Sequence, residues 1–305
     1  MPDRPLTPSR PHAAIDPAVL EEPKRAPFVE LGLVSCFSFL RGASHPHELI
    51  ETGRLLGCDA MGIADANSMA GVVRFHTAAK TLKLRPIIGC RIETVEGLHL
   101  LAYPRDRTAY GKLCSLISAG RMKTSAGEWQ AKGVCEISLS MLAENSEGVQ
   151  LILLPPDDFA HRFDLSSDTR RDSKVSEKQG LYLVPETPPQ GNLEAILPYL
   201  VGRLPTLRHL AASYLYRGDD IARIQRLDAM ARANGLSVLA SNHVHYHSPE
   251  RRPLQDVMTA IRHKTNIAKA GYLLHPNAER HLKSPQEMLE LFRRWPHAID
   301  AAREV

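Results

Sequence analysis

The chain has 305 residues, of which 43% are hydrophobic and 24% are charged, so it has the composition of an ordinary globular protein with room for one large or two ordinary domains. Its formal net charge of +4 is too small to indicate nucleic-acid binding without further evidence. No apolar run is long enough to cross a membrane, and the first residues lack the apolar core of a secretion signal. We therefore expect a cytoplasmic protein with no membrane partner.

The cysteines are spread along the chain without any C-x-x-C pair. There are five of them, an odd number: Cys36, Cys58, Cys90, Cys114 and Cys135. This pattern argues against a disulfide framework and against a structural zinc site. We expect free thiols in a reducing compartment.

The first elements follow a proline-rich beginning. Residues 1–26 contain six prolines and little that could pack, which predicts a disordered leader. A strand is expected over 29–34, and Ser44 is expected to cap the helix that follows. The apolar run 60–65 predicts a buried strand that ends at Asp65.

The alternation of strands and helices continues to residue 250. Helical periodicity is strongest over 219–235, where apolar residues recur three apart and Asn-Gly ends the pattern. A strand over 237–247 runs into a histidine-rich sequence. Seven strands alternating with amphipathic helices over about 220 residues favour an α/β barrel over a small open sheet. The other expected elements are a helix at 108–120 and strands at 86–92, 99–104, 149–156 and 181–186.

The character of the chain changes after residue 250. Residues 251–305 are helical and basic, with Ser284 as an expected helix cap. We therefore divide the chain into the leader (1–26), a barrel (27–250) and this helical segment. The chain stops at Val305 within a helical pattern, which suggests a part of something longer.

A barrel also predicts where a site would lie, since functional side chains of such barrels sit just past the C-terminal ends of strands. Asp65 and the sequence 241–247 both occupy that position. His243, His245 and His247 alternate, so a strand would present them together as metal ligands. Alternatively, one or two of them are hydrogen-bonded core or rim histidines, and a metal needs further ligands from elsewhere. The spacing leaves both interpretations open.

Other kinds of active site leave no motif in the sequence. There is no G-x-S-x-G nucleophile elbow, no G-x-x-x-x-G-K-[ST] phosphate loop and no strand-borne G-x-G-x-x-G. The neighbouring aspartates at 157–158 and 219–220 open a charged loop and a helix, so neither pair indicates a two-metal centre. The basic residues of 251–294 suit DNA phosphates and a solvated helix face equally, and DNA-binding residues stay unassigned.

Several collinear segments carry a resemblance to a known family. They are residues 28–80, which begin FVELGLVSCFSFLRGASHP, then LYRGDD (215–220), 241–263 and HPNAERHLKSPQEM (275–288). Together they resemble the polymerase-and-histidinol-phosphatase (PHP) domain at the start of bacterial C-family DNA polymerases, in its error-prone branch. The resemblance runs from Phe28 to Val305. It implies a distorted (β/α)7 barrel followed by the helical basic segment, in agreement with the alternation.

The resemblance further implies where an active relative would hold its metal ions, and several of these positions have lost their ligands. The two histidines of an opening H-x-H motif fall on Gly32 and Val34. The histidine expected next to Asp65, which is kept, falls on Ala66. A glycine, a valine and an alanine offer no ligand atoms.

The two remaining ligand positions differ as well. The expected glutamate falls on Arg91, and a terminal D-x-H motif becomes His243 and His245, of which only the second matches. Arginine does not deprotonate, so Arg91 keeps a positive charge where cations should bind. At about 4 Å and an effective dielectric near 20, that repulsion costs about 4 kcal/mol per pair of unit charges. We therefore expect no bound metal and no catalytic residue in this chain, and a scaffolding pair between Arg91 and Asp65.

Three functional hypotheses follow. The resemblance implies the N-terminal part of an error-prone DNA polymerase, a nucleotidyltransferase of damage-induced mutagenesis and translesion synthesis, with a non-catalytic barrel. The alternatives are a stand-alone metal-dependent phosphoesterase and a protein-interaction module. On the first hypothesis Mg²⁺ is held only by a palm domain outside this chain. The partners are then DNA, other mutagenesis proteins and the sliding clamp.

Overall fold

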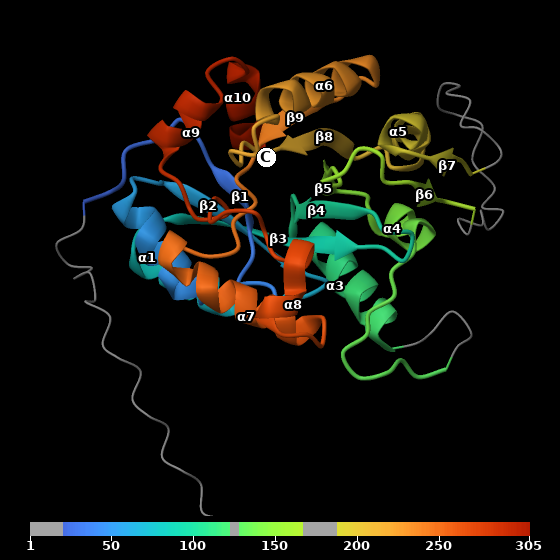
Figure 1. Ribbon diagram of the computed structural model, residues 1–305, viewed down its shortest axis with the longest axis horizontal. Coiled ribbons are helices and arrows are strands. Elements are labelled where there is room, and N and C mark those ends of the chain that lie inside the picture. Colours follow the sequence, from blue (N-terminus) through green and yellow to red (C-terminus); the bar gives the residue numbers. More distant parts are fainter. Residues whose placement is uncertain (1–20, 123–127, 167–187) are drawn as a thin grey trace, which may run out of the picture.

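The computed structural model describes residues 21–122, 128–166 and 188–305. Its centre is a curled seven-stranded sheet with the strand order β1-β2-β3-β4-β5-β8-β9 (Figure 1). A separate pair is formed by β6 (Phe163–Asp164) and β7 (Gln190–Gly191). The seven strands are β1 (Glu30–Leu33), β2 (Ala60–Ala66), β3 (Arg85–Glu93), β4 (His99–Pro104), β5 (Val149–Leu154), β8 (Leu207–Ala212) and β9 (Ser237–Ala240).

One strand of the central sheet runs against the others. β4 is antiparallel to both of its neighbours, whereas the remaining pairs are parallel. The reason is local, because β3 and β4 are joined by a tight turn with Gly97 at φ +82°, a conformation that favours glycine. A turn of this kind reverses the chain, while parallel neighbours need a longer crossover. The predicted α/β class is confirmed, with β4 as its antiparallel exception.

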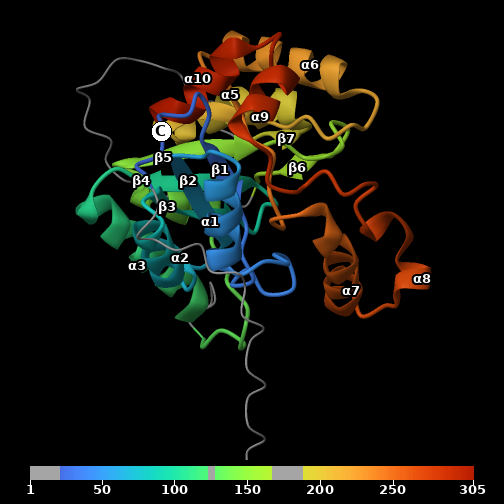
Figure 2. The same cartoon turned by 90° about the vertical axis from the view of Figure 1, so that its left-hand side faces the viewer.

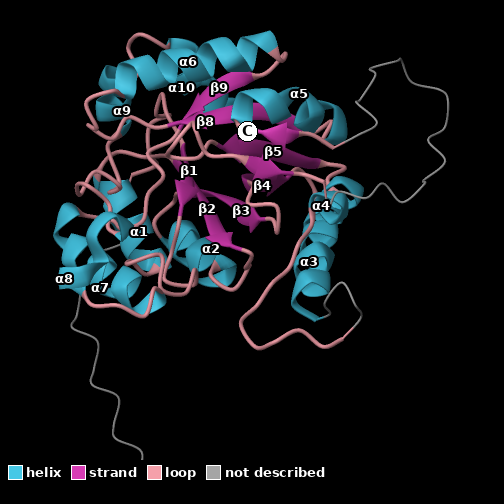
Figure 3. Ribbon diagram, turned by 45° about the vertical axis from the view of Figure 1, so that its right-hand side comes forward, coloured by secondary structure: helices cyan, strands magenta, loops and turns pink. Residues whose placement is uncertain are grey.

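Helices cover the outside of the sheet (Figure 3). The helices are α1 (Pro46–Leu55), α2 (Val72–Thr81), α3 (Arg107–Met122), α4 (Leu139–Asn145), α5 (Leu193–Arg203), α6 (Asp220–Ala233), α7 (Arg252–Arg262), α8 (Ile267–Ala270), α9 (Pro285–Leu291) and α10 (Pro296–Glu304). α1 and α2 bury Leu49, Ile50 and Phe75 against Met61 and Ile63 of β2. Among the described residues, no helix is both long and apolar enough to cross a membrane.

The two ends of the curled sheet are joined by a buried carboxylate. Glu30 of β1 accepts hydrogen bonds from the Ser241 hydroxyl (2.6 Å) and from the Asn242 backbone N–H (2.7 Å), just past β9. It also accepts one from the backbone N–H of Gly32 (2.8 Å). The backbone continues the closure, since the N–H of Val34 donates to the carbonyl of Val244 (2.9 Å). The first and last strands are thus connected at the end of the sheet where their chains leave it.

Most predicted elements agree with the structure. The strand expected at 99–104 is β4 without any change of bounds, Ser284 does cap α9, and the helix expected at 219–235 is α6. The predicted cap of α1 is wrong. The helix begins after His45, which is its N-cap, and the Ser44 hydroxyl is bonded to His247 instead. The expected strand at 181–186 and most of the expected leader lie outside the described residues.

The segment after residue 250 divides into two parts. α10 packs directly on β9, and the main core continues through Met288, Phe292 and Trp295. By contrast, α7 and α8 stand apart from the sheet (Figure 2). The division at residue 250 thus stays a prediction about domains, while the hydrophobic core itself extends across that position.

Candidate functional site

A cleft of about 310 Å³ opens at the C-terminal ends of the parallel strands, where the barrel prediction expects a site. Loops after β5 and β9 form much of its wall. The antiparallel β4 contributes its first residue, His99. Positively charged and imidazole side chains dominate the lining, which consists of Arg91, Gly97, His99, Leu154, Pro155, Pro156, Asp157, His161, Phe163, His243, His245, His275 and Arg280.

The alternating histidines do not share one face, contrary to the prediction of a strand over 237–247. β9 ends at Ala240, and His243 has a backbone φ of +52° that no strand permits. His243 and His245 both line the cleft, with ring centroids 5.2 Å apart. His247 lies elsewhere and contacts the Ser44 hydroxyl at 2.8 Å. The turn at His243 therefore separates the third histidine from the first two.

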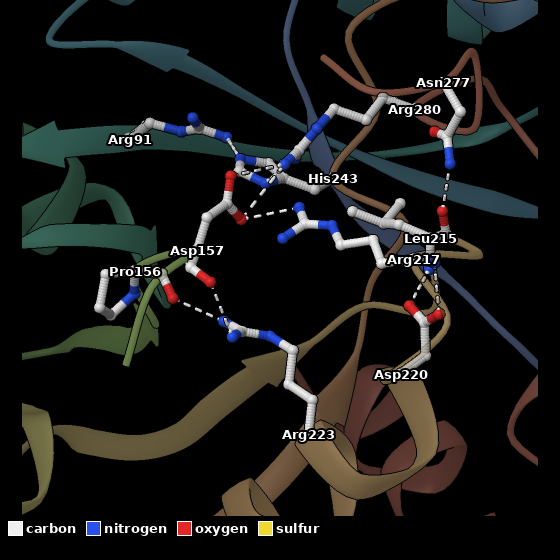
Figure 4. A network of polar contacts seen from close by, with 10 residues as sticks. All are labelled: Arg91, Pro156, Asp157, Leu215, Arg217, Asp220, Arg223, His243, Asn277 and Arg280. Atoms are coloured by element: carbon white, nitrogen blue, oxygen red, sulfur yellow. Dashed lines mark hydrogen bonds and ion pairs between the residues drawn. The ribbon is translucent and has the colours of Figure 1, made fainter. Parts of the chain in front are cut away.

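His243 lies between two guanidinium groups (Figure 4). The Arg91 guanidinium contacts its Nε2 atom, and Arg280 contacts its Nδ1 atom at 2.6 Å. Burial lowers the pKa of His243 well below its ordinary value, and both arginines lower it further. Burial also lowers the pKa of Arg91 to about 10, which still leaves the side chain charged at neutral pH. His243 is therefore a neutral ring between two cations.

One carboxylate forms ion pairs with the arginines of the cleft. Asp157, which follows β5, lies 2.8 Å from Arg217 and 3.3 Å from Arg280. Burial disfavours its charged form, but Arg280 and Arg217 prevail and hold the pKa of Asp157 below its ordinary value. Arg223 binds the neighbouring backbone carbonyls of Pro156 and Asp157. Arg217, Arg223 and Arg280 thus all contact the loop after β5, where Asp157 is the carboxylate that pairs with them (Figure 4).

The predicted pair between Arg91 and Asp65 does not form. In the register of β2 and β3, Asp65 is opposite Cys90, and Arg91 is opposite Ala66. Successive side chains of a strand project on opposite faces, so Arg91 points into the mouth of the barrel and Asp65 points away from it. The resemblance implied that both residues lie at metal-ligand positions, but the pleat of the strands directs their side chains to opposite faces.

Asp65 instead holds the loop that follows β1. Its carboxylate accepts hydrogen bonds from the Ser35 hydroxyl (2.7 Å), the Ser35 backbone N–H (2.8 Å) and the Ser38 hydroxyl (2.7 Å). Burial raises the pKa of Asp65, and these hydrogen bonds oppose that effect. Asp65 is therefore an anchor for the loop on the outer face of the sheet.

One lost ligand position, Gly32, has no room for a side chain, and the other two are held by backbone hydrogen bonds. A Cβ atom added at Gly32 would come 2.5 Å from the Ser241 hydroxyl and 3.2 Å from Glu30. Val34 is buried and bonded through its backbone to Val244, and Ala66 donates its N–H to the Ser38 hydroxyl (2.9 Å). The Glu30 closure thus fills the space that a ligand at position 32 would need.

The residues present do not fit a metal ion. Within the described part of the chain, no group of three or more histidine, cysteine, aspartate or glutamate side chains is placed to hold one. His243 meets a guanidinium at each ring nitrogen, so neither nitrogen faces a free coordination position. Two buried arginines also repel a cation that enters the cleft.

Several cleft residues were missed by sequence reasoning. Arg280 counted only as one basic residue of the C-terminal segment, and Asp157 only as the start of a charged loop. His275 was not singled out, although its ring lies 5.3 Å from that of His245. The H-P-N-A-E-R sequence at 275–280 was the available signal, since it belongs to a segment that carries the family resemblance.

The sequence of this chain is similar to a known domain family and to named proteins. A family profile described as the PHP domain matches residues 30–179. A protein of Caulobacter vibrioides named error-prone DNA polymerase is 38% identical over 279 residues, which cover 91% of this chain and 22% of that protein. The protein of the same name from Brucella abortus is 37% identical over 283 residues, covering 91% and 23%. The chain thus spans under a quarter of the length of these curated relatives.

Likeness to solved structures is weaker. An amidohydrolase from Chromobacterium violaceum is 12% identical with a TM-score of 0.46, covering 72% of this chain and 87% of that one. A lesion-specific endonuclease from Pyrococcus furiosus is 10% identical with a TM-score of 0.41, covering 72% and 48%. Scores this low say nothing about the chemistry of this chain.

Proposed function

We propose that this chain, whose residues 30–179 match the PHP domain profile, is the N-terminal part of an error-prone DNA-directed DNA polymerase. The observation that carries this proposal is the similarity itself, which covers 91% of the chain and only 22% of a relative of that name. A match of this shape is typical of one domain of a longer enzyme. The polymerase chemistry then belongs to regions that this chain does not contain.

The barrel itself serves as a non-catalytic scaffold in this proposal. The space at position 32 is filled by the Ser241 hydroxyl and by Glu30, which are hydrogen-bonded to each other, and Arg91 and Arg280 flank His243. A metal-dependent hydrolase of phosphate esters would need side chains at these positions that coordinate its metal ions. The same features favour a scaffold over a stand-alone metal-dependent phosphoesterase.

The complete protein would act on DNA in the cytoplasm, in damage-induced mutagenesis and translesion synthesis. Its catalytic Mg²⁺ would be held by a palm domain, and no cofactor is assigned to the present chain. The sliding clamp and other mutagenesis proteins are its proposed partners. The names of the relatives support the polymerase, while lesion bypass and partners follow from the resemblance to the error-prone branch.

A domain exchange tests the proposal. The matching N-terminal region of the Caulobacter vibrioides relative is replaced by this chain, and primer extension is measured on a DNA template with Mg²⁺. We expect the hybrid to extend the primer and the relative without its N-terminal region to lose that activity. A folded hybrid with no more activity than the deletion would contradict the proposal.

A second assay separates the scaffold from an enzyme. The isolated chain is incubated with a chromogenic phosphate ester and Mn²⁺, and no hydrolysis above the buffer rate is expected. Turnover that disappears on chelation would overturn the scaffold role and favour a metal-dependent phosphoesterase.

A further inference from the structure

A second, smaller groove shares no lining residue with the cleft. The loop after β8, the start of α6 and the end of α9 form its walls, and its volume is about 200 Å³. A groove of this size is smaller than ordinary small-molecule sites, so it suits single side chains of a peptide. The aromatic and apolar part of its lining consists of Tyr214, Tyr216, Ile221, Leu291 and Trp295.

Tyr216 is held in this groove through its neighbours on both sides. The Asp220 carboxylate accepts hydrogen bonds from the backbone N–H groups of Leu215 (2.7 Å) and Arg217 (2.6 Å) (Figure 4). Tyr216 lies between them with a φ of +52°, which a bulky residue rarely adopts. It is 55% exposed, and its ring meets that of Tyr214 edge-on with centroids 5.2 Å apart. The loop therefore presents an aromatic ring to solvent in a strained conformation, a feature that is common at ligand sites.

Aromatic grooves of this kind bind proline-rich segments. Prolyl rings pack between aromatic side chains, and a polyproline II helix loses little entropy on binding because it is already extended. Tyrosine and tryptophan are also the residue types that most often carry the binding energy of a protein interface. The alternative ligand is single-stranded nucleic acid, whose bases stack on aromatic rings but whose phosphates need a positively charged surface.

The charges around the groove favour a peptide over nucleic acid. Two arginines line the groove, and one of them, Arg293, pairs with Glu290 (2.8 Å). Burial raises the pKa of Tyr216, and the nearby carboxylates of Glu279 and Glu287 raise it further. Carboxylates at this end of the groove repel phosphates and attract a basic side chain. The groove therefore fits a proline-rich segment that carries positive charge.

The chain contains such a segment at its beginning. Prolines recur there every three residues, and a polyproline II helix has three residues per turn, so this spacing aligns the rings along one edge. Residues 1–12 also contain two arginines and one aspartate, a net positive charge. These are features of the sequence alone, since residues 1–20 lie outside the described part of the chain. We name the four prolines the proline row: Pro2, Pro5, Pro8 and Pro11.

The described chain begins close enough for the proline row to reach the groove. Ala26 forms a backbone hydrogen bond with Asp59, which pairs with Arg303 near the C-terminal end of α10. Trp295 directly precedes the same helix, whose nine residues are about 14 Å long. The nine residues 12–20 connect the row to the described chain, and nine extended residues span up to ~30 Å. This connection is about twice as long as α10.

We propose that the groove between the loop after β8 and α9 binds the proline row of the same chain. The prolyl rings lie against the aromatic side chains, and Arg10 lies beside the carboxylate of Glu287. Linkage within one chain gives the row an effective concentration of ~1 mM, so a contact with a Kd of ~0.1 mM is about 90% occupied. The inference goes beyond a role in a polymerase and holds or fails independently of that role.

Fluorescence of Trp295 tests the proposal, because Trp129 is the only other tryptophan of the chain. Trp129→Phe is introduced into the full chain and into a shortened chain that lacks residues 2–16, all of which precede the described fold. A synthetic peptide of residues 1–16 is then added to each. We expect saturable binding to the shortened chain with a Kd of ~0.1 mM. Apparent binding to the full chain should be about 10-fold weaker, because its own row competes.

Matched variants on both sides identify the contact. In the peptide, Pro5→Ala and Pro8→Ala together should weaken binding to the shortened chain at least ~10-fold, whereas Thr7→Ala should not. In the shortened chain, Tyr216→Gly removes the ring and keeps the backbone unstrained, since glycine accepts a positive φ. It should also weaken binding at least ~10-fold, whereas Tyr272→Gly, at an exposed tyrosine outside the groove, should bind as before.

Several outcomes would refute the proposal. They are no binding of the peptide by the shortened chain up to ~2 mM, equal affinity of the full and shortened chains, and equal affinity of the alanine peptide. A single-stranded oligonucleotide that displaces the peptide would show a nucleic-acid site instead. A full chain that dimerises while the shortened chain stays monomeric would contradict binding within one chain, and sedimentation at the concentrations used measures this.

Discussion

Glu30 shows how a single side chain closes the sheet. All three of its hydrogen-bond partners are donors, namely the N–H groups of Gly32 and Asn242 and the hydroxyl of Ser241. Burial raises the pKa of Glu30, and these hydrogen bonds oppose that rise. The ionised form matches the three donors best, because it only accepts hydrogen bonds. The carboxylate therefore stabilises the junction of β1 and β9 at a considerable desolvation cost.

We expect Glu30→Gln to destabilise the protein by about 1–3 kcal/mol, because its amide group turns a donor toward a donor. Glu30→Ala should cost at least as much, since it leaves all three donors buried and unpaired. Unfolding in urea, followed by circular dichroism, measures both changes. The matched control is Glu144→Gln at an exposed position of α4, which should unfold like the original chain. Equal stability of Glu30→Gln and the control would show that Glu30 does not close the sheet.

At the scale of elements, α7 is inverted relative to a usual surface helix. Its buried positions are Gln255, Thr259 and Ala260, while Leu254 and Ile261 are 42% and 56% exposed. A helix in a globular protein normally turns its apolar stripe toward the core. The stability of α7 in this chain therefore does not depend on its apolar face.

We expect the double substitution Leu254→Ser and Ile261→Ser to change the free energy of unfolding by less than about 0.5 kcal/mol per site. Ala260→Asp on the buried face of the same helix should instead cost at least ~2 kcal/mol, because it buries an unpaired charge. Thermal unfolding of the two variants beside the unmodified chain makes the comparison. A large loss of stability from the serine pair would mean that the stripe is packed in solution.

α10 behaves in the opposite way, since it belongs to the core. Ala298 and Ala302 are buried and the helix packs on β9, so small side chains set the distance between the helix and the sheet. We expect Ala298→Leu to cost about 1–3 kcal/mol through overpacking. Asp300→Leu places the same side chain on the exposed face of α10 and should cost less than about 0.5 kcal/mol. Similar urea midpoints for the two variants would contradict this packing.

At the scale of the whole molecule, buried histidines make stability depend on pH. Burial, together with Arg280, lowers the pKa of His275 to about 3, and burial and Arg91 lower the pKa of His243 well below its ordinary value. An unfolded histidine binds a proton near pH 6.5, so acid favours the unfolded chain. The raised pKa values of Glu30 and Asp65 act with the opposite sign, and they favour the folded chain at lower pH.

We expect His275→Gln to reduce the loss of stability between pH 6.5 and pH 5. His275 faces four other charged or titratable groups, Arg280, Asp157, Arg252 and Arg217, besides the His245 ring. Each histidine that stays neutral in the folded protein lowers the free energy of unfolding by up to ~1.4 kcal/mol for each pH unit below pH 6.5. Above pH 6.5 this loss of stability is absent. Melting temperatures at several pH values, compared with those of the unmodified chain, measure the difference. An unchanged pH slope would show that His275 is protonated in the folded protein.

Much of the architecture could be predicted from the hydrophobic pattern of the sequence, because the periodicity of a helix or a strand depends only on residues close together in the chain. β2, β4, α6 and the α/β class follow from it, and the resemblance supplied the family and the position of Arg91 among the ligand sites. β8 and α5 were missed. The apolar sequence 193–212 runs on without a clear change of period, and helix and strand are hard to separate there.

The partners of the cleft residues could be decided only by tertiary structure. Arg91 and His243 are 152 residues apart, and Arg280 joins them from a segment that pattern described only as basic. The pleat of β2 and β3 directs Asp65 and Arg91 to opposite faces, and a turn at His243 removes His247 from the cleft. Side-chain direction depends on register and on single backbone angles, so residue types and spacing could mark these positions without pairing them.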